Sequence, residues 1–261
     1  MMELHNVKEA VRQTVLRTGR DTNNVRLIAV SKGQSQDKIH EAFEAGQRDF
    51  GENYVQELME KTQGLSSKIY WHFLGHLQKN KVNKVIGKIA WLHSLDSLEL
   101  ALAINKKSLQ EVVENAGPAS RTACVSPKRG PSHPARLSPA FSTTLLQPLK
   151  CLLEIKLSKE TTKTGLTPSA AFELIPKLND LSNIDLCGLM TIPPFDDDPE
   201  KSRPYFRELF NLLKEMNQRY LYKIKLTELS MGMSHDFKIA IEEGSTMVRI
   251  GSAIFGERKG K

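Results

Sequence analysis

Short apolar runs alternate with amphipathic stretches along this chain of 261 residues. Apolar runs bounded by turn residues predict buried strands, whereas apolar positions that recur every three or four residues predict helices. The strands expected from this pattern cover residues 25–31, 47–50, 69–74, 89–95, 149–157, 184–190, 225–230 and 246–250. The helices expected between them cover residues 2–18, 36–45, 53–62, 77–87, 97–114, 168–181, 200–219 and 236–243.

The order of these elements indicates the fold class. Parallel strands joined by right-handed helical crossovers are the usual arrangement when strands and helices alternate. Eight such units predict an α/β protein with a (β/α)8 barrel, and a doubly wound open sheet is the alternative. Asp96 and Thr167 are expected to cap the helices that follow them, with Pro168 in the first helical position.

One segment, residues 117–148, interrupts the alternation. It holds six of the twelve prolines and many Ser and Thr residues, and it shows neither the helical nor the strand period. Prolines at this density prevent a regular helix or a central strand. We therefore expect one barrel domain over residues 1–261, interrupted by a disordered basic insertion. A basic arm that recruits a partner is the alternative interpretation of this segment.

The net charge of +7 does not by itself predict binding to nucleic acid. Residues 116–150 contain five basic residues and no Asp or Glu, so they account for +5 and the rest of the chain carries only +2. A nucleic-acid or partner-binding module that uses the basic insertion is therefore a weak alternative, and we expect no nucleic-acid partner.

The apolar runs are too short to cross a bilayer, and the first 15 residues read as a charged amphipathic helix without a signal-peptide core. We therefore expect a cytoplasmic protein without membrane contact. The three cysteines, Cys124, Cys151 and Cys187, lack the CxxC spacing of zinc sites and have no neighbouring His or Cys partners. They predict free thiols, with neither a disulfide framework nor a metal site.

Lys32 ends the first apolar run, VRLIAVS at residues 25–31. The carboxyl ends of parallel strands are where barrels of this class place their chemistry. A lysine in an apolar wall loses part of its preference for the charged form, and the neutral amine is the form that attacks an aldehyde to make a Schiff base. A lysine that only begins a solvated turn is the alternative.

Two turns that contain glycine follow the last two strands, LSMGMSHD at 229–236 and VRIGSAIFG at 248–256. Small residues let backbone N–H groups approach an anion, and serine hydroxyls add donors. Barrels commonly build a phosphate site from the loops after strands seven and eight. Candidate phosphate ligands are Ser230, Ser234, Gly251 and Ser252.

Arg249 lies on the last strand, two residues before Gly251. An arginine that points into a barrel needs an anion or an acceptor, because burying an unpaired charge is unfavourable. A salt bridge to Glu228 or Glu242 would satisfy it equally well, so both interpretations stay open here.

Three further strand ends carry polar residues. FGENY places Glu52 and Asn53 at the rim, and WHFLGHLQ contains His72 and His76. The histidine spacing crosses a strand-to-loop junction without a following glutamate, which disfavours a zinc pair. We expect His72 to lie in the core and His76 to face the pocket. TTKTG offers Lys163 as an anion contact or as a solvated turn residue.

Seven segments support a family resemblance: AVSKG, FGENYVQEL, WHFLGHLQKNK, LDS, GLMTI, LSMGMSHDF and GSTMVRIGSAIFGER. In this order, from about residue 25 to 258, they resemble the pyridoxal phosphate homeostasis proteins, which bind pyridoxal 5′-phosphate (PLP) and are related to the barrel domain of alanine racemase. The resemblance implies that Lys32 holds PLP as an aldimine. It also implies that the phosphate lies among Ser234, Gly251 and Ser252, and that Arg249 faces the pyridine nitrogen.

The resemblance also implies a role. An arginine against the pyridine nitrogen leaves that nitrogen unprotonated, which weakens PLP as an electron sink. We expect a PLP carrier and regulator of vitamin B6 homeostasis that acts as a monomer, serves apo PLP-dependent enzymes and has no catalytic residues. A PLP-dependent amino-acid racemase is the alternative, but this sequence ends soon after the last barrel motif, so we expect the second base of a racemase to be missing. The expected cofactor-binding residues are Lys32, Asn53, His76, Ser230, Ser234, Arg249, Gly251 and Ser252.

Overall fold

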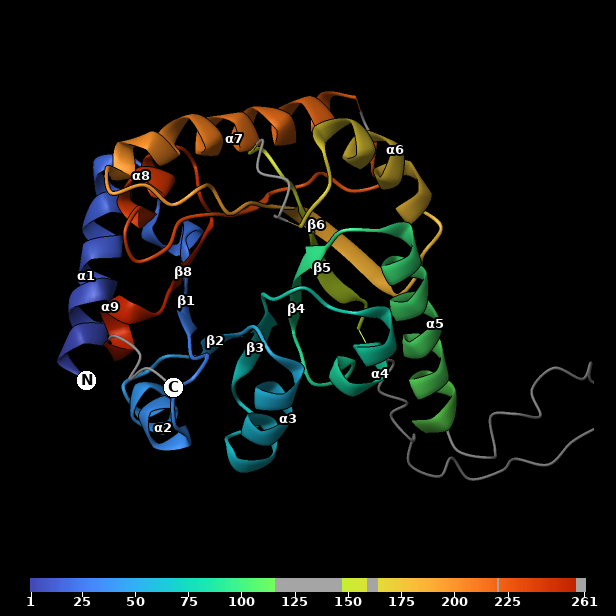
Figure 1. The fold of residues 1–261 in the computed structure, drawn as a ribbon, viewed down its shortest axis with the longest axis horizontal. Coiled ribbons are helices and arrows are strands. Elements are labelled where there is room, and N and C mark those ends of the chain that lie inside the picture. Colours follow the sequence, from blue (N-terminus) through green and yellow to red (C-terminus); the bar gives the residue numbers. More distant parts are fainter. Residues whose placement is uncertain (116–146, 159–163, 220, 257–261) are drawn as a thin grey trace, which may run out of the picture.

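The computed structural model describes residues 1–115, 147–158, 164–219 and 221–256 (Figure 1). The predicted insertion therefore lies outside the described residues except for its last two positions, and so does Lys163.

Eight parallel strands close into a barrel in the order of the sequence. Each strand pairs with the next, and β8 pairs with β1 through the register Ile28 to Arg249. The (β/α)8 prediction is confirmed and the open-sheet alternative is wrong. The strands are β1 (Arg26–Val30), β2 (Asp49–Glu52), β3 (Tyr70–Phe73), β4 (Trp91–Leu95), β5 (Leu149–Glu154), β6 (Ile184–Met190), β7 (Glu228–Ser230) and β8 (Met247–Ile250).

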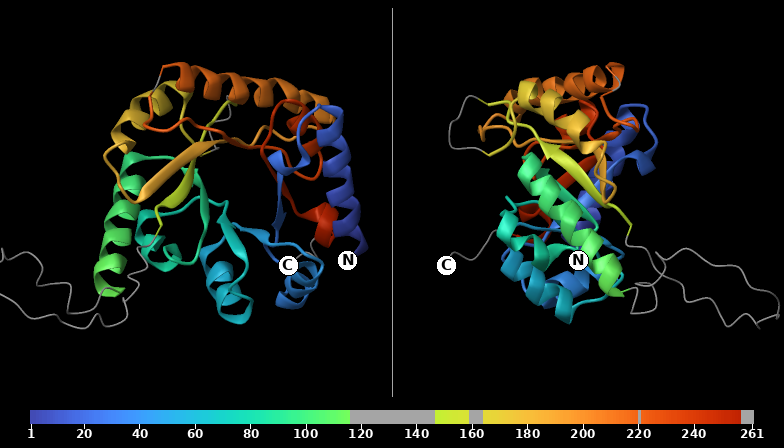
Figure 2. Two further views of the ribbon diagram at one scale, coloured as in Figure 1. Left: turned by 180° about the vertical axis from the view of Figure 1, so that it is seen from behind. Right: turned by 90° about the vertical axis from the view of Figure 1, so that its right-hand side faces the viewer.

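Helices surround the barrel as an outer ring (Figure 1). The first helix packs against the last two, which closes the ring at the chain ends (Figures 1 and 2). The α-helices are α1 (Met2–Arg17), α2 (Gln36–Glu44), α3 (Val55–Gly64), α4 (Val82–Val85), α5 (Leu98–Asn115), α6 (Pro168–Leu178), α7 (Arg203–Gln218), α8 (Phe237–Glu242) and α9 (Ser252–Phe255). Three short 3₁₀ helices are η1 (Thr22–Asn24), η2 (Lys79–Lys81) and η4 (Pro199–Ser202).

The helix predicted at 77–87 is wrong in extent, because the chain forms η2 and the short α4 there. Leu77 and Val82 are both buried but stand five residues apart. A regular α-helix would place them about 140° apart around its axis, so one unbroken helix over 77–87 would not turn both side chains to the same face.

The predicted helix starts are confirmed for α6 and displaced by one residue for α5. The Thr167 hydroxyl accepts from the Ala170 N–H at 3.2 Å, and Pro168 occupies the first turn. At α5 the Ser97 hydroxyl, not the expected Asp96, accepts from the Leu100 N–H at 3.3 Å.

The strands separate two apolar clusters. Leu92 and Val248 belong to the large cluster between barrel and helices. Their neighbours Trp91 and Met247 belong to a small cluster that also contains Ile28, Leu152 and Met190. Because successive strand residues point to opposite faces, the small cluster fills the barrel interior. Among the described residues, no helix has both the length and the apolar character needed to span a bilayer.

Candidate functional site

A cavity of about 300 Å³ lies at the carboxyl ends of the strands. Its lining comes chiefly from β1, β8 and the loops that follow β2, β6 and β7. Six of the eight predicted site residues line it: Lys32, Asn53, Ser234, Arg249, Gly251 and Ser252. Residues from positions 32 to 252 therefore meet at one end of the barrel, which is the end where barrels of this class carry their sites.

Two predicted site residues lie elsewhere. His76 is half exposed, and its Nδ1 lies 3.0 Å from the Asp96 carboxylate, in a separate depression that also contacts Asn53. Ser230 is completely buried below the cavity, where its hydroxyl meets Arg249. The structure therefore assigns His76 to the rim and Ser230 to a supporting position.

The Arg249 side chain is almost fully buried. Its Nη1 donates to the Ser230 hydroxyl at 2.6 Å, and its Nη2 donates to the Thr191 carbonyl at 2.9 Å. The alternative of a salt bridge is wrong, since Glu228 accepts from Thr246 and Glu242 pairs with Arg203, which belongs to α7.

Burial lowers the pKa of Arg249 to about 10, although the carboxylates of Asp236 and Glu154 favour its charged form. The guanidinium therefore stays charged at neutral pH. Because both acceptors of Arg249 are neutral, they do not neutralise the positive charge of the guanidinium. That charge can therefore interact with a ligand in the cavity.

The backbone on either side of Lys32 is held by α3. The Lys61 ammonium, buried despite its charge, donates to the Ser31 carbonyl at 2.8 Å. The Glu57 carboxylate accepts from the Gly33 N–H at 2.7 Å and from Lys61 at 2.9 Å. Lys32 itself is half-buried and lines the cavity. The strand end that carries Lys32 is thus fixed at both neighbouring residues.

Glu52 completes this buried network instead of reaching the rim as predicted. Its Oε1 accepts from Lys61 at 2.7 Å and from the Ser31 hydroxyl at 2.6 Å. Its Oε2 has no hydrogen-bond partner among the described residues. Burial raises the pKa of Glu52, although Lys61 and Ser31 oppose that shift.

The loops after β7 and β8 place backbone amides around Ser234. Gly232 adopts φ +94°, where a side chain is strained, and its carbonyl accepts from the Arg249 N–H at 2.9 Å. The Ser234 hydroxyl lies 3.4 Å from the N–H groups of both Gly251 and Ala253. Convergent amides and hydroxyls of this kind suit an anion such as phosphate.

The alanine racemase N-terminal domain family matches residues 4–259, nearly the whole chain. A pyridoxal phosphate homeostasis protein of Aquifex aeolicus is 38% identical over 257 residues, which cover 98% of this chain and 97% of the relative. The chain belongs to the pyridoxal phosphate homeostasis protein family. The mouse member is 40% identical over 98% of this chain and 85% of its own length.

Solved structures agree with this family assignment. PipY of Synechococcus elongatus, solved with PLP bound, is 31% identical with a TM-score of 0.73, and the match covers 94% of this chain and 98% of PipY. An alanine racemase of Clostridium difficile is 16% identical with a TM-score of 0.63, and the match covers 97% of this chain but 57% of the racemase. The second likeness concerns the fold alone.

The sequence did not predict that Lys61, Thr191 and His93 hold the site residues in place. Lys61 has one visible signal, because it lies three residues after Leu58 on the buried face of α3. Thr191 follows the end of β6 within the GLMTI segment, but the bond to Arg249 comes from its backbone carbonyl, and His93 lies inside β4. Their partners are 58 and 137 residues away in sequence, so only the closed barrel brings them together.

Proposed function

We propose that this protein binds PLP in the cavity at Lys32 and serves PLP homeostasis as a carrier and regulator. Two observations support the proposal. The relatives that match nearly the whole chain are named for PLP homeostasis, and PipY was solved with PLP. The cavity also gathers a lysine, an arginine and a set of backbone amides at one end of the barrel.

The residues present fit PLP by their chemistry. When bound, PLP supplies an aldehyde that reacts with amines and a ring that withdraws electrons. Lys32 is the amine in the cavity lining, and Ser234 with the amides of Gly251 and Ala253 suits the phosphate. Arg249 is a permanent donor that suits an unprotonated ring nitrogen. The single observation that carries the proposal is the meeting of Lys32 and Arg249 in one cavity.

The arginine favours holding PLP over transforming a substrate. Because the guanidinium keeps its proton, it does not protonate the ring nitrogen, and a neutral ring stabilises carbanions poorly. Amino-acid racemisation needs such stabilisation as well as two bases. We therefore propose a protein that stores PLP and releases it to apo PLP-dependent enzymes, as a cytoplasmic monomer.

The proposal is tested by adding PLP to the purified protein and reducing the complex with borohydride. We expect a visible absorption band of lysine-bound PLP, and peptide mapping should find the reduced cofactor on Lys32. Lys32→Ala should lose the band and the label. Lys38→Ala is the matched control, since Lys38 lies nearby on α2 but hydrogen bonds to Gln34 and the Phe255 carbonyl. An unchanged band in Lys32→Ala would overturn the assignment.

A second measurement separates carrier from racemase. The loaded protein is incubated with L-alanine in deuterated water, and a separate sample is mixed with an apo PLP-dependent enzyme. The carrier proposal expects no sustained exchange at Cα and recovery of activity in the apo-enzyme. Continuous exchange with loss of chirality would favour the racemase.

A further inference from the structure

Five polar side chains form a continuous hydrogen-bonded chain through the barrel. The Asp49 carboxylate lies 3.0 Å from His72 Nε2, and His72 Nδ1 lies 2.9 Å from His93 Nε2. His93 Nδ1 lies 2.9 Å from the Ser230 hydroxyl, which Arg249 Nη1 approaches to 2.6 Å. His72, His93 and Ser230 have no exposed surface. The five residues come from strands β2, β3, β4, β7 and β8.

The charged ends of this polar chain determine where every proton lies. The guanidinium can only donate, the carboxylate can only accept, and both rings are neutral, so Ser230 accepts from Arg249 and donates its own proton to His93 Nδ1. His93 therefore carries its proton on Nε2 and donates to His72 Nδ1. His72 in turn carries its proton on Nε2 and donates to Asp49. The opposite order would leave His72 Nε2 facing the carboxylate as a second acceptor, so with both rings neutral only one arrangement satisfies all four hydrogen bonds.

The interior of the polar chain is uncharged. Burial lowers the pKa of His72, although Asp49 favours the charged form, and burial lowers the pKa of His93 well below its ordinary value. Trp91 stacks on the His72 ring with an interplanar angle of 2° and a centroid distance of 5.9 Å. The ring orientation of His72 is thereby fixed by packing as well as by hydrogen bonds.

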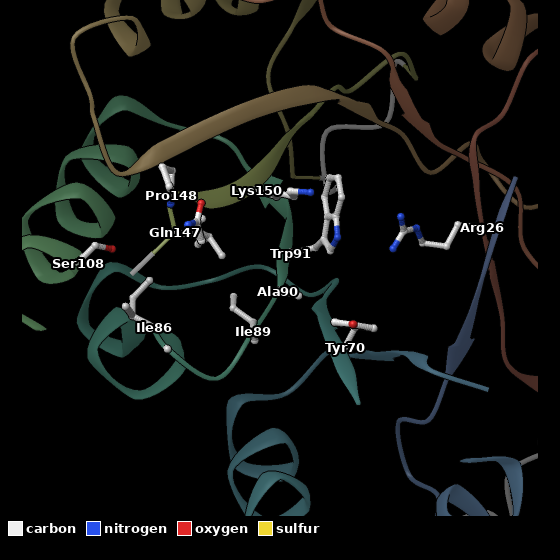
Figure 3. Close-up of a pocket in the computed structure, with 12 residues that line it drawn as sticks. Arg26, Tyr70, Ile86, Ile89, Ala90, Trp91, Ser108, Gln147, Pro148 and Lys150 are labelled. Atoms are coloured by element: carbon white, nitrogen blue, oxygen red, sulfur yellow. The ribbon is translucent and has the colours of Figure 1, made fainter. Parts of the chain in front are cut away.

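The two ends of the polar chain open on opposite faces of the barrel. Arg249 lines the Lys32 cavity. Asp49 is also bonded to Arg26 at 2.9 Å, and Arg26 lines a second cavity of about 390 Å³ where the strands begin. Figure 3 shows this second cavity, with Arg26 and Lys150 near Trp91. The guanidinium in the cofactor cavity is therefore linked through neutral groups to a carboxylate at the far end of the barrel.

We propose that His93 and His72 are positioning residues that hold the Ser230 hydroxyl as a fixed acceptor for Arg249, so that the guanidinium keeps one place in the Lys32 cavity. The identity of the ligand it meets there rests on the proposed function. Ser230 alone could rotate its hydroxyl. His93 fixes that rotation by accepting the proton, and His72 fixes the tautomer of His93.

The first test needs no cofactor. Long-range ¹H–¹⁵N NMR spectra of the apo-protein at pH 7 should show both imidazoles neutral, with the proton on Nε2 and a bare Nδ1. The Arg249 Nε–H signal should be sharp in the wild type and broadened in His93→Leu. A proton on Nδ1 of either ring, a charged imidazole, or an unchanged Arg249 signal in the variant would overturn the proposal.

The second test measures PLP affinity and the absorption maximum of bound PLP. Ser230→Ala should bind roughly tenfold more weakly or worse, because it removes a hydrogen bond to a charged group. His93→Leu should weaken binding by roughly three- to tenfold and move the band, while His93→Gln, which offers both an acceptor and a donor, should recover most of the loss.

Leu92→Ala is the matched control, since it removes a buried side chain next to His93 that faces the helices instead of the barrel interior. It should keep the wild-type affinity and band. Wild-type affinity and band position in His93→Leu would overturn the positioning role. If the wild type itself failed to bind PLP, the proposed function would fall, while the tautomer measurement would still decide the polar chain.

Discussion

The two principal side chains of the cavity are held in opposite ways. The strand end at Lys32 is fixed from outside the barrel by charges, since Lys61 of α3 is bonded to Glu52, Glu57 and the Ser31 carbonyl. The Arg249 side chain is fixed inside the barrel by neutral acceptors, the Ser230 hydroxyl and the Thr191 carbonyl.

The difference fits the role that we propose for each group. Under that proposal Lys32 reacts with an aldehyde and needs a fixed backbone, which the network provides by holding Ser31 and Gly33. An arginine that only has to present a charge is better fixed at the guanidinium itself. Neutral acceptors hold it without cancelling the charge. Three predictions test this comparison.

The largest effect is expected for Lys61→Met. It leaves the buried Glu52 without its cation, which costs about 3–5 kcal/mol in the free energy of unfolding. Urea denaturation measures this loss. Lys201→Met is the matched control: Lys201 and Asp196 are 2.9 Å apart in an exposed ion pair, so this variant should lose little stability. The double variant Lys61→Met with Glu52→Gln should recover part of the stability. Equal losses in Lys61→Met and Lys201→Met would refute the view that buried charges hold the strand end at Lys32.

A smaller effect is expected for Gly232→Ala on the Arg249 side. The added Cβ would lie 2.5 Å from the Ala240 Cβ at a positive φ, so the loop must shift. We expect a loss of about 1–3 kcal/mol in the free energy of unfolding, together with weaker PLP binding. Gly19→Ala has a similar φ of +71° with no atom within 4 Å, so it isolates the backbone strain and should cost less. Equal losses for both variants would contradict the importance of close packing at Gly232.

The smallest effect is a slope of stability against pH. The pKa of both His72 and His93 is lowered in the folded protein. The unfolded chain therefore binds protons first, and the free energy of unfolding falls as the pH drops below about 6.5. Glu52 acts in the opposite direction. Its pKa is raised on folding, so the folded chain takes up this proton first, and stability rises as acid neutralises the buried carboxylate.

Comparison with variants isolates the histidine contribution. Urea denaturation between pH 7 and 5 should give a slope that is smaller in His93→Leu, by an amount that approaches about 1.4 kcal/mol per pH unit at the acid end, the contribution of one proton. Leu92→Ala should lower the stability without changing the slope. An unchanged slope in His93→Leu would mean that His93 is also protonated in the folded chain.

The sequence pattern was sufficient for the barrel and for most of the cavity lining. Strand ends and glycine turns are local signals, so Lys32, Asn53, Ser234, Gly251 and Ser252 could be assigned to one end of the fold from their positions alone. The helix at 77–87 could not be predicted correctly, because its apolar spacing was mistaken for a regular helical period.

The support of the site was not predictable for a different physical reason. Ser230 has the local signature of an anion-binding turn residue, yet its side chain points into the barrel. There its hydroxyl lies 2.9 Å from Nδ1 of His93, which belongs to a strand far away in the sequence. His76 follows its strand as a pocket residue should, yet Asp96 holds it at the rim. Both outcomes depend on which side chains the closed barrel brings into contact, and the types of the individual residues do not predict those contacts.

The bonds from α3 to the neighbours of Lys32 have a consequence for how the protein opens. The Gly33 amide donates to Glu57 and the Ser31 carbonyl accepts from Lys61, so the end of β1 and the helix α3 belong to one cooperative unit of local unfolding. Native-state hydrogen exchange at Gly33 should therefore report the opening of α3. The backbone at Lys32 should therefore become more mobile when α3 detaches from the barrel.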